Sequence, residues 1–581
     1  MEKRLLLAVL LISAVMVITN LLFPPPPPVE ESAGEPTDSV AAVSTPAAPA
    51  VAAPVITAPE DTVAADTVVV TSGLYRYAFS TRGASLVRAE LPEYPSYTRP
   101  GESVQLAPED ADEFLSLRLV VGSDTIDLSR VVFTPNLASI TLAEGGEPQT
   151  LRFSYADPSG FGVNLSYTFQ PDRYLIRVRG EVIGLAGRPA TLVTAMGPGL
   201  APHEARDHHS ERELAVVLRS DGDVERLRMA NLQGSVPLPG PMTWVGLKDK
   251  YFVVAQIAGD EHPFTQGTAT RLRDVSHFFV EGEDTIAASL PRAEVIAALP
   301  VSADGVVEYD LYAGPQDFQQ LAAAGYELED VTQYAYAWLE PVIRPFAALI
   351  LIILDFLHDT LDLAYGWVLV IFGVFLRILL WPLNAKAFRA QLKNMAVTPL
   401  MQEIREKYKD DPQKQQEALM RLYKEHGFNP LAGCLPMLLP WPVLITLFFV
   451  FQNTIAFRGA GFLWLPDLSL RDPLYVLPLF LVASMFAMQW VTTQMSGVEQ
   501  NPQMKMMMYV LPIMMGIFFY SMPAGLNLYY ATTNVAGLPQ QLMIARERRR
   551  AQEEMKAQKG SPRPAPMPSG SKGRKKRQAR G

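Results

Sequence analysis

The sequence predicts a polytopic α-helical membrane protein that also carries a large β domain. Long apolar runs recur at the N-terminus and through the C-terminal half, which is the pattern of membrane-spanning helices. Between them, residues 163–170 alternate apolar and polar side chains, which is the pattern of a strand with one buried face. A chain of 581 residues is too long for one compact domain, so the two patterns indicate separate domains.

The N-terminal residues predict a membrane anchor followed by a linker. Residues 1–23 begin with basic side chains and continue as an apolar run that is longer than the core of about 7–15 residues in a cleaved signal peptide. We therefore expect an uncleaved signal anchor with its N-terminus in the cytoplasm. Residues 24–66 are rich in Pro, Ala, Val and Thr and contain no Lys or Arg, as expected of an extended, translocated linker.

Residues 67–330 predict a β-sandwich domain that ends in a helical segment. Val163, Leu165, Tyr167 and Phe169 share one face of a strand, and Gly, Pro and Asp interrupt such strands throughout the region. From Phe318 onward the apolar residues take a helical spacing instead.

One cluster in this domain has side chains of the kind that bind metals. It consists of His203, Asp207, His208, His209 and Glu211. The cluster lacks a fixed helical or hairpin spacing, so the sequence favours a solvated loop. No nucleophile motif or phosphate-binding loop accompanies it. We expect no metal, no cofactor and no enzymatic activity.

Residues 331–365 contain a shorter apolar run, Phe346–Leu357, which Asp355 interrupts. About 20 apolar residues are needed to cross a bilayer, so a dozen are too few. The segment predicts an amphipathic helix at the outer interface, with a further crossing as the alternative.

Residues 366–545 predict five spans, which makes six with the anchor. The apolar runs are residues 366–383, 431–451, 473–495 and 506–544, and the last is divided by a turn signal at residues 521–525. Alternation from the cytoplasmic N-terminus places residues 384–430 and the C-terminus in the cytoplasm.

Arg377 lies inside the first of these runs. An arginine there costs about 2.5–3.5 kcal/mol on insertion scales, so an intramembrane charge indicates a functional site. Snorkelling toward the cytoplasm is the structural alternative. In the final span, Asn527, Tyr530 and Asn534 recur on one helical face. Packing between helices would explain these residues, but together with Arg377 they favour a shared hydrated cavity.

Two basic segments are predicted on the cytoplasmic side. Residues 384–430 carry nine Lys and Arg and keep a helical spacing on both sides of Asp410-Asp411-Pro412, which predicts a helical hairpin. Residues 546–581 carry thirteen Lys and Arg, as in a disordered tail that binds RNA or anionic lipid, although anchoring by positive charge alone is an alternative.

Three motifs resemble the YidC/Oxa/Alb family of membrane protein insertases. They are Leu376-Arg377…Trp381-Pro382-Leu383, Tyr423-Lys424…Asn429-Pro430-Leu431-x-Gly433-Cys434-x-Pro436 and Pro523-x-Gly525-Leu526-x-Leu528-Tyr529-Tyr530. The resemblance covers residues 338–550, and the anchor, linker and β domain are similar to the Gram-negative type of the family.

The resemblance implies a six-span inner-membrane insertase with a periplasmic β-supersandwich domain, a cytoplasmic helical hairpin, and a hydrophilic groove open to cytoplasm and lipid. Its implied partners are nascent membrane proteins, the Sec translocon, the lipid bilayer and, through the tail, the ribosome. The implied groove residues are Arg377, Asn527, Tyr529, Tyr530, Thr533 and Asn534. The implied hairpin residues are Arg405, Lys407, Tyr423 and Lys424, and the implied tail residues are Arg548, Arg549, Arg550, Lys575, Lys576 and Arg577.

One motif departs from the family. Where many relatives have Gln-Met-Pro in the third span, this chain has Pro440-Trp441-Pro442, so the polar side chain of that helix is missing.

Two other functions fit parts of the sequence. A transporter of an anionic solute would use the same buried arginine, but it is expected to show an inverted repeat of spans, and none is visible. A membrane-anchored periplasmic protein that binds or hydrolyses carbohydrate would use the β domain, but it has no need for a charged span.

Overall fold

The computed structural model describes most of the chain after the linker. The described residues are 65–111, 114–158, 160–205, 213–281, 284–335, 339–382, 384–385, 400, 403–404, 406–409, 411–425, 441–496 and 502–560. The predicted anchor and nearly all of the predicted linker therefore lie outside the described residues.

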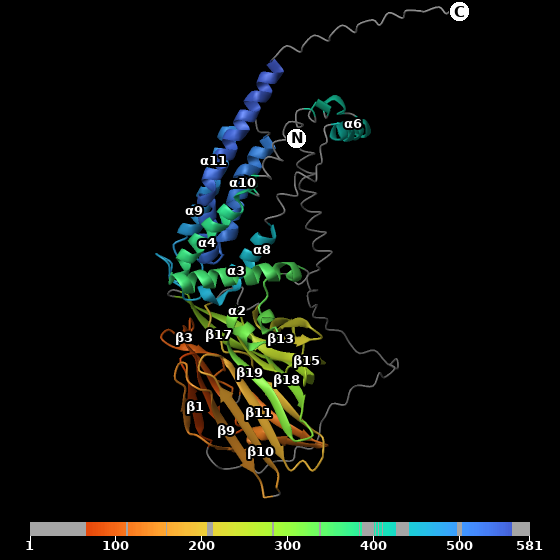
Figure 1. The fold of residues 1–581 in the computed structure, drawn as a ribbon, viewed down its shortest axis with the longest axis vertical. Helices are drawn as coiled ribbons and strands as arrows, with labels where there is room; N and C mark the ends of the chain where they lie inside the picture. Colours follow the sequence, from red (N-terminus) through yellow and green to blue (C-terminus); the bar gives the residue numbers. More distant parts are fainter. Residues whose placement is uncertain are drawn as a thin grey trace, which may run out of the picture. The chain divides into compact units, whose positions relative to one another are not determined.

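The β domain contains a small and a large sheet (Figure 1). The small sheet has five strands in the order β4-β3-β2-β1-β8, which are Ser103–Gln105, Leu86–Pro95, Arg76–Ser80, Thr67–Thr71 and Ser139–Thr141. Its strands pair antiparallel except β1 and β8, which are parallel.

The large sheet has fourteen strands in the described part of the chain. Its main path runs β6-β5-β12-β18-β17-β15-β16-β19-β11-β10-β9-β7, and β13 pairs with both β14 and β15. The first strands of this sheet in chain order are β5 (Leu115–Val121), β6 (Asp124–Asp127) and β7 (Thr134–Pro135). They are followed by β9 (Gln149–Ala156), β10 (Gly162–Phe169), β11 (Leu175–Ile183) and β12 (Ala190–Met196). The next strands are β13 (Ala215–Ser220), β14 (Asp223–Arg228), β15 (Ser235–Lys248) and β16 (Phe252–Ile257). The last are β17 (Phe264–Glu281), β18 (Asp284–Pro300) and β19 (Val306–Pro315). Two short 3₁₀ helices, Leu128–Arg130 and Met229–Asn231, connect strands.

The alternating pattern of residues 163–170 is confirmed as β10. Its apolar residues are buried while the residues between them are half-exposed. Tyr167 packs against Phe79 of β2 with ring centroids 4.8 Å apart, so the small and large sheets share one core. Burying each such aromatic ring contributes on the order of 1.5–3 kcal/mol.

A short helical segment follows the sheet, as the change in spacing predicts. Helix α2 (Phe318–Ala324) begins where the side chain of Asp317 accepts the backbone N–H of Gln320, and it ends at Gly325, whose φ of 85° suits glycine. The 3₁₀ helix η4 (Leu328–Val331) comes next.

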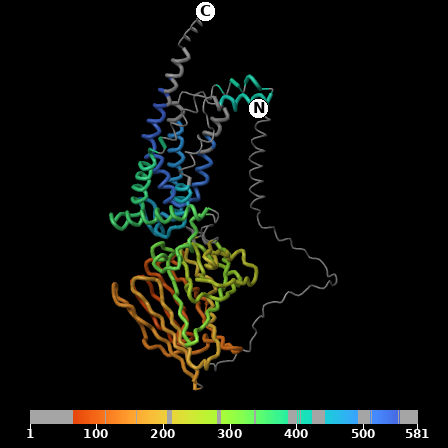
Figure 2. The backbone as a smooth tube through the Cα atoms, turned by 45° about the vertical axis from the view of Figure 1, so that its right-hand side comes forward, coloured from red at the N-terminus to blue at the C-terminus, as the bar shows by residue number. Residues whose placement is uncertain are grey.

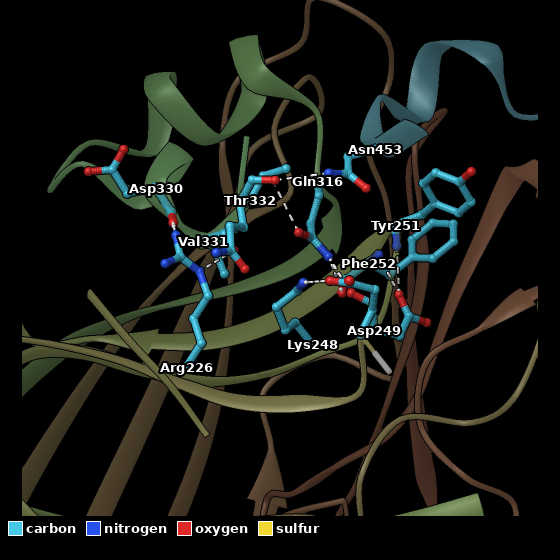
Figure 3. Close-up of polar contacts among 12 residues, drawn as sticks. Arg226, Lys248, Asp249, Tyr251, Phe252, Gln316, Asp330, Val331, Thr332 and Asn453 are labelled. Carbon is cyan, nitrogen blue, oxygen red and sulfur yellow. Dashed lines mark hydrogen bonds and ion pairs between the residues drawn. The ribbon is translucent and has the colours of Figure 1, made fainter. Parts of the chain in front are cut away.

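Polar contacts fix this segment to the large sheet (Figure 3). Gln316 donates to the carbonyl oxygens of Asp249 and Phe252 at 2.9 and 3.0 Å, and its own carbonyl accepts from Thr332. Arg226 of β14 donates to the carbonyl oxygen of Asp330. The chain therefore leaves the β domain in a fixed direction.

The remaining described elements are helices (Figures 1 and 2). They are α3 (Glu340–Leu361), α4 (Tyr365–Leu379), α6 (Pro412–Glu425), α8 (Trp441–Asn453), the 3₁₀ helix η5 (Ile455–Phe457), α9 (Val476–Ser496), α10 (Pro502–Tyr520) and α11 (Ala524–Gly560). Helix α11 packs mainly against α4 and α9.

Helix α3 is longer than the apolar run of a dozen residues from which it was predicted. It has 22 residues, and among the described helices it alone has the length and hydropathy needed to cross a membrane. It lies crosswise to α9 and α11 (Figures 1 and 2). Ile350 and Leu354 are buried, whereas Leu349, Ile352 and Phe356 are exposed. A position at the outer interface stays a prediction.

The predicted turn within the last apolar run is confirmed, because α10 ends at Tyr520 and α11 begins at Ala524. The expectation of a wholly disordered tail is wrong for its first part, since α11 continues to Gly560. Helix-forming residues and an i,i+4 pair between Arg549 and Glu553, 3.0 Å apart, favour this continuation.

The helix start predicted at Asp410-Asp411-Pro412 is also confirmed. Helix α6 begins at Pro412, and the side chain of Asp411 accepts the backbone N–H of Lys414 at 3.1 Å. Much of the rest of residues 384–430 lies outside the described residues, so the hairpin itself stays a prediction.

Candidate functional site

Close packing of α4 on α11 builds the site around Arg377. At Gly373 a Cβ atom would lie only 3.3–3.5 Å from Thr532, Thr533 and Tyr529. Glycine therefore lets the two helices approach closely, as small residues do between membrane helices. Arg377 lies one turn further along α4, in the last turn of the helix.

The guanidinium of Arg377 lies against Gly537 of α11. A Cβ atom on Gly537 would be 2.6 Å from Nη2 and 2.9 Å from Cζ, so a larger residue would displace the arginine. The Nε atom of Arg377 is buried and has no hydrogen-bond partner. Within the described ranges no carboxylate pairs with Arg377. Its position in the last turn of α4 is favourable for a cation, because the C-terminal end of a helix carries partial negative charge.

The two tyrosines of the predicted site have different surroundings. Tyr529 is buried and packs against Phe372 of α4 and Phe451 of α8, at centroid distances of 6.1 and 5.2 Å. Tyr530 is partly exposed and packs against Phe519 of α10 at 5.0 Å. Tyr529 is thus a packing centre for three helices, while Tyr530 borders a more open surface.

The predicted polar face of α11 does not form one open surface. Asn527 is 0% exposed, and its amide donates to the carbonyl oxygens of Phe519 and Met522. It holds the turn between α10 and α11, so its assignment to the groove is a correction. Asn534 donates to Ser484 of α9 at 3.0 Å, and Thr533 donates to the carbonyl of Tyr530.

Sequence reasoning missed residues next to the arginine. Gly537 has no chemical signature, and only the contact with Arg377 identifies it. Gln540, one turn further along α11, is buried and donates to the carbonyl of Trp381 at 3.3 Å. The spacing of Asn527, Tyr530 and Asn534 continues to position 537, but a glycine there has no polar side chain, and Gln540 lies off that face.

The predicted hairpin and tail residues are only partly described. Lys407 lies in a short helical stretch, and Tyr423 and Lys424 lie in α6. Arg548, Arg549 and Arg550 lie in α11. The other predicted residues, Arg405, Lys575, Lys576 and Arg577, are outside the described residues, as is Pro440 of the divergent motif.

The predicted metal-like cluster is corrected at His203. This residue is 2% exposed and lies 2.8 Å from a carboxylate oxygen of Asp249, so it is not on a solvated loop. Burial alone would raise the pKa of Asp249, but His203 and the backbone N–H groups of Phe252 and Tyr251 hold that pKa below its usual value. Residues 207–211 lie outside the described residues, and the described ones form no group that fits a metal.

The fold and the arginine define a class: a helical membrane protein with a large β domain outside the bilayer. Residues 67–349 match the family model described as the YidC periplasmic domain, and residues 356–552 match the one described as 60Kd inner membrane protein. A membrane protein insertase YidC of Chlorobium phaeovibrioides is 30% identical over 506 residues, covering 82% of each chain. One of Bordetella pertussis is 29% identical over 498 residues, also covering 82% of each chain.

The chain belongs to the YidC family of membrane protein insertases. It inserts proteins into the inner membrane, is not an enzyme, and has a periplasmic domain, which is the β domain. Among solved structures, an active YidC insertase with its first transmembrane domain resolved is similar over 84% of this chain and 95% of its own, with 17% identity and a TM-score of 0.31. A galactose mutarotase-like protein from Lactobacillus casei is similar over 43% and 99%, with 11% identity and a TM-score of 0.28. Neither likeness bears on function.

Proposed function

We propose that the chain inserts nascent membrane proteins through a hydrophilic groove beside α4 and α11, in which Arg377 is a transient counter-charge. The supporting observation is that Arg377 lies against Gly537, with its Nε unpartnered and with no carboxylate partner among the described residues. A structural arginine in an apolar helix usually pairs with an opposite charge or with backbone carbonyl groups. Among the described residues no carboxylate competes for Arg377, which leaves its guanidinium available to a passing acidic group.

The mechanism needs no covalent step. An acidic flank of a nascent segment cannot cheaply cross an apolar slab about 30 Å thick. A water-filled groove that extends partway through the membrane shortens the apolar path that the flank must cross. Arg377 lowers the electrostatic cost of moving the charge of the flank along that path. The apolar part of the segment then leaves the groove for lipid, driven by the hydrophobic effect.

The proposed groove is lined by Arg377, Tyr530 and Thr533, with Tyr529 and Asn534 as supporting residues between helices. Thr446 of α8 donates to the carbonyl of Pro442, so its hydroxyl does not replace the missing glutamine of that helix. Arg377 therefore carries more of the polarity of this groove than in relatives with Gln-Met-Pro.

The proposed topology has six spans with both termini in the cytoplasm. The nine basic residues of residues 384–430 support a cytoplasmic helical hairpin there. The crosswise direction of α3, with apolar residues on both its buried and its exposed sides, supports a position at the outer interface. We further propose that the Sec translocon can act with the protein and that the basic tail contacts the ribosome.

Photo-crosslinking to a stalled nascent membrane protein tests the groove. A crosslinking amino acid at Tyr530 or Thr533 should capture the nascent apolar segment. The matched control is Val535, which is exposed on another side of the same helix. Equal or stronger capture from Val535 would place the path elsewhere and contradict the proposal.

A further inference from the structure

We propose that the loop between α8 and α9, residues 454–475, connects the periplasmic domain to the start of α11, and that Arg458 is the positioning residue of this loop. The two ends of the loop belong to helices of the membrane part, yet the side chain of Arg458 lies inside the periplasmic domain. The expected effect of Arg458 variants on insertion rests on the proposed groove, whereas their expected effect on the position of the start of α11 does not.

Arg458 is completely enclosed. Its side chain is 0% exposed, and its Nε donates to an oxygen of Glu204, which is 11% exposed, at 2.8 Å. Its Nη2 donates to the carbonyl of Pro95 at 2.8 Å, and its guanidinium lies 4.4 Å from the ring centroid of Tyr97. All of these partners come from the periplasmic domain, so Arg458 binds there as a ligand would bind a pocket.

A second contact holds the same loop. The hydroxyl of Tyr97 donates to Asp467, whose side chain also accepts the backbone N–H groups of Gly459 and Ser469 at 2.9 and 2.6 Å. Asp467 therefore fixes the conformation of the loop and joins it to the periplasmic domain. Asn453 at the end of α8 adds a bond to the carbonyl of Gln333 at 2.9 Å (Figure 3).

The other side of the loop holds the first turn of α11. The first backbone N–H groups of a helix have no partner within it. Here Ala524 donates to the carbonyl of Leu470 at 2.7 Å, and Gly525 donates to that of Leu468 at 2.8 Å. A Cβ atom on Gly525 would lie 3.2 Å from the Leu468 oxygen, so glycine permits this close contact.

Aromatic packing continues the connection toward the proposed groove. Phe457, next to Arg458, is buried and packs against Phe451 at a centroid distance of 5.5 Å. Phe451 packs against Tyr529 of α11 at 5.2 Å. The loop therefore contacts α11 both at its first turn and, through Phe451, one turn further along. A shift of Arg458 would move the helix that carries Tyr529 and Gly537.

The energetics of a buried ion pair suggest variants that separate an effect on the position of the loop from an effect on the stability of the fold. Removing one partner leaves an uncompensated charge in the interior, whereas replacing both by apolar residues of similar volume is often neutral or stabilising. Arg458→Met and Glu204→Met should each displace the loop, and the double variant should restore it. Arg179→Met is the control, because Arg179 forms a surface pair with Glu308 in the same domain.

The test measures position and insertion separately on the full chain. Spin labels replace Glu144 in the periplasmic domain and Ser521 in the α10–α11 turn, both exposed, in a background with Cys434→Ser. Pulsed EPR then gives the distribution of distances between them. Insertion of a reporter is measured per folded molecule, so that loss of protein alone does not count.

Each single variant should broaden the distance distribution and lower insertion by about threefold, a size typical of coupling residues remote from a site. The double variant and the control should resemble the parent. Unchanged distances in the single variants would overturn the proposal. So would a double variant whose distances and insertion are disturbed as much as those of the two single variants added together. Changed distances with unchanged insertion would support the connector while contradicting the proposed groove.

Discussion

At the scale of single residues, the proposed groove depends on Arg377 and on Gly537, against which its guanidinium lies. An arginine in an apolar run is visible in any sequence because its cost in a membrane is large. The contact with Gly537 joins residues 160 positions apart and depends on how two helices pack, which no local pattern contains. Asn527 was misassigned for the same reason, since helical spacing gives a shared face but not what covers it.

Substituting Gly537 by alanine should impair substrates with acidic flanks. The new methyl group would lie 2.6 Å from Nη2 of Arg377, so the guanidinium must leave its position. A displaced rotamer costs about 0.5–1.5 kcal/mol, which corresponds to a loss of up to about tenfold in insertion of an acidic reporter. Insertion of a neutral reporter should change little.

The control for this prediction is Val535→Ala, an exposed position on the same helix that should leave both reporters unaffected. Equal losses for acidic and neutral reporters with Gly537→Ala would indicate disturbed helix packing and contradict a role through the arginine.

At the scale of elements, the sequence located strand β10, the start of α6 and the turn between α10 and α11 correctly, and it erred at the ends of α3 and α11. Strand β10 was predictable because alternation directly reports one buried face. The ends of α3 and α11 were less predictable because apolar patterns stop where polar residues begin, whereas backbone hydrogen bonds continue. Its polar neighbours in the sequence predict a solvated loop at His203. The residue does lie between strands, but its contact with Asp249 keeps it buried inside the domain.

The basic tail should bind ribosomes through phosphate contacts. Thirteen Lys and Arg in residues 546–581, with no aromatic residue among them, suit electrostatic binding to RNA, which weakens steeply as salt is raised. Co-sedimentation with ribosomes at low and high salt should show strong binding of the full chain at low salt only. A protein truncated after residue 545 should bind weakly at both. Equal sedimentation of both proteins at low salt would rule the tail out as the main contact.

At the scale of the whole molecule, the parts proposed to insert substrates all follow the periplasmic strands in sequence. Arg377, the groove residues of α11 and the basic segment of residues 384–430 lie after β19, which ends at Pro315. The sequence predicted this division because membrane and strand patterns differ in kind. It could not predict the connector at Arg458, because an arginine in a loop between two spans looks like any solvated charge.

Deleting residues 67–302 should leave insertion largely intact, with a loss no larger than the roughly threefold one expected of the Arg458 variants, because the deletion removes no groove residue. It removes Glu204 together with the interior that buries Arg458, so no unpaired charge stays buried. The measurement is insertion of a reporter at matched expression of parent and deletion. Complete loss in a well-expressed deletion protein would contradict this division of labour.

The charge of Arg377 offers the most direct test of the central claim. One reporter with zero, one or two aspartates in its translocated flank is inserted by Arg377→Lys, Arg377→Ala and Arg377→Glu at matched expression. Lysine should retain most activity because it keeps the cation. The alanine defect should grow with each aspartate, and glutamate should be worst because like charges repel strongly in a medium of lowered dielectric constant. A defect independent of the number of aspartates, or no defect at all, would contradict the counter-charge role of Arg377.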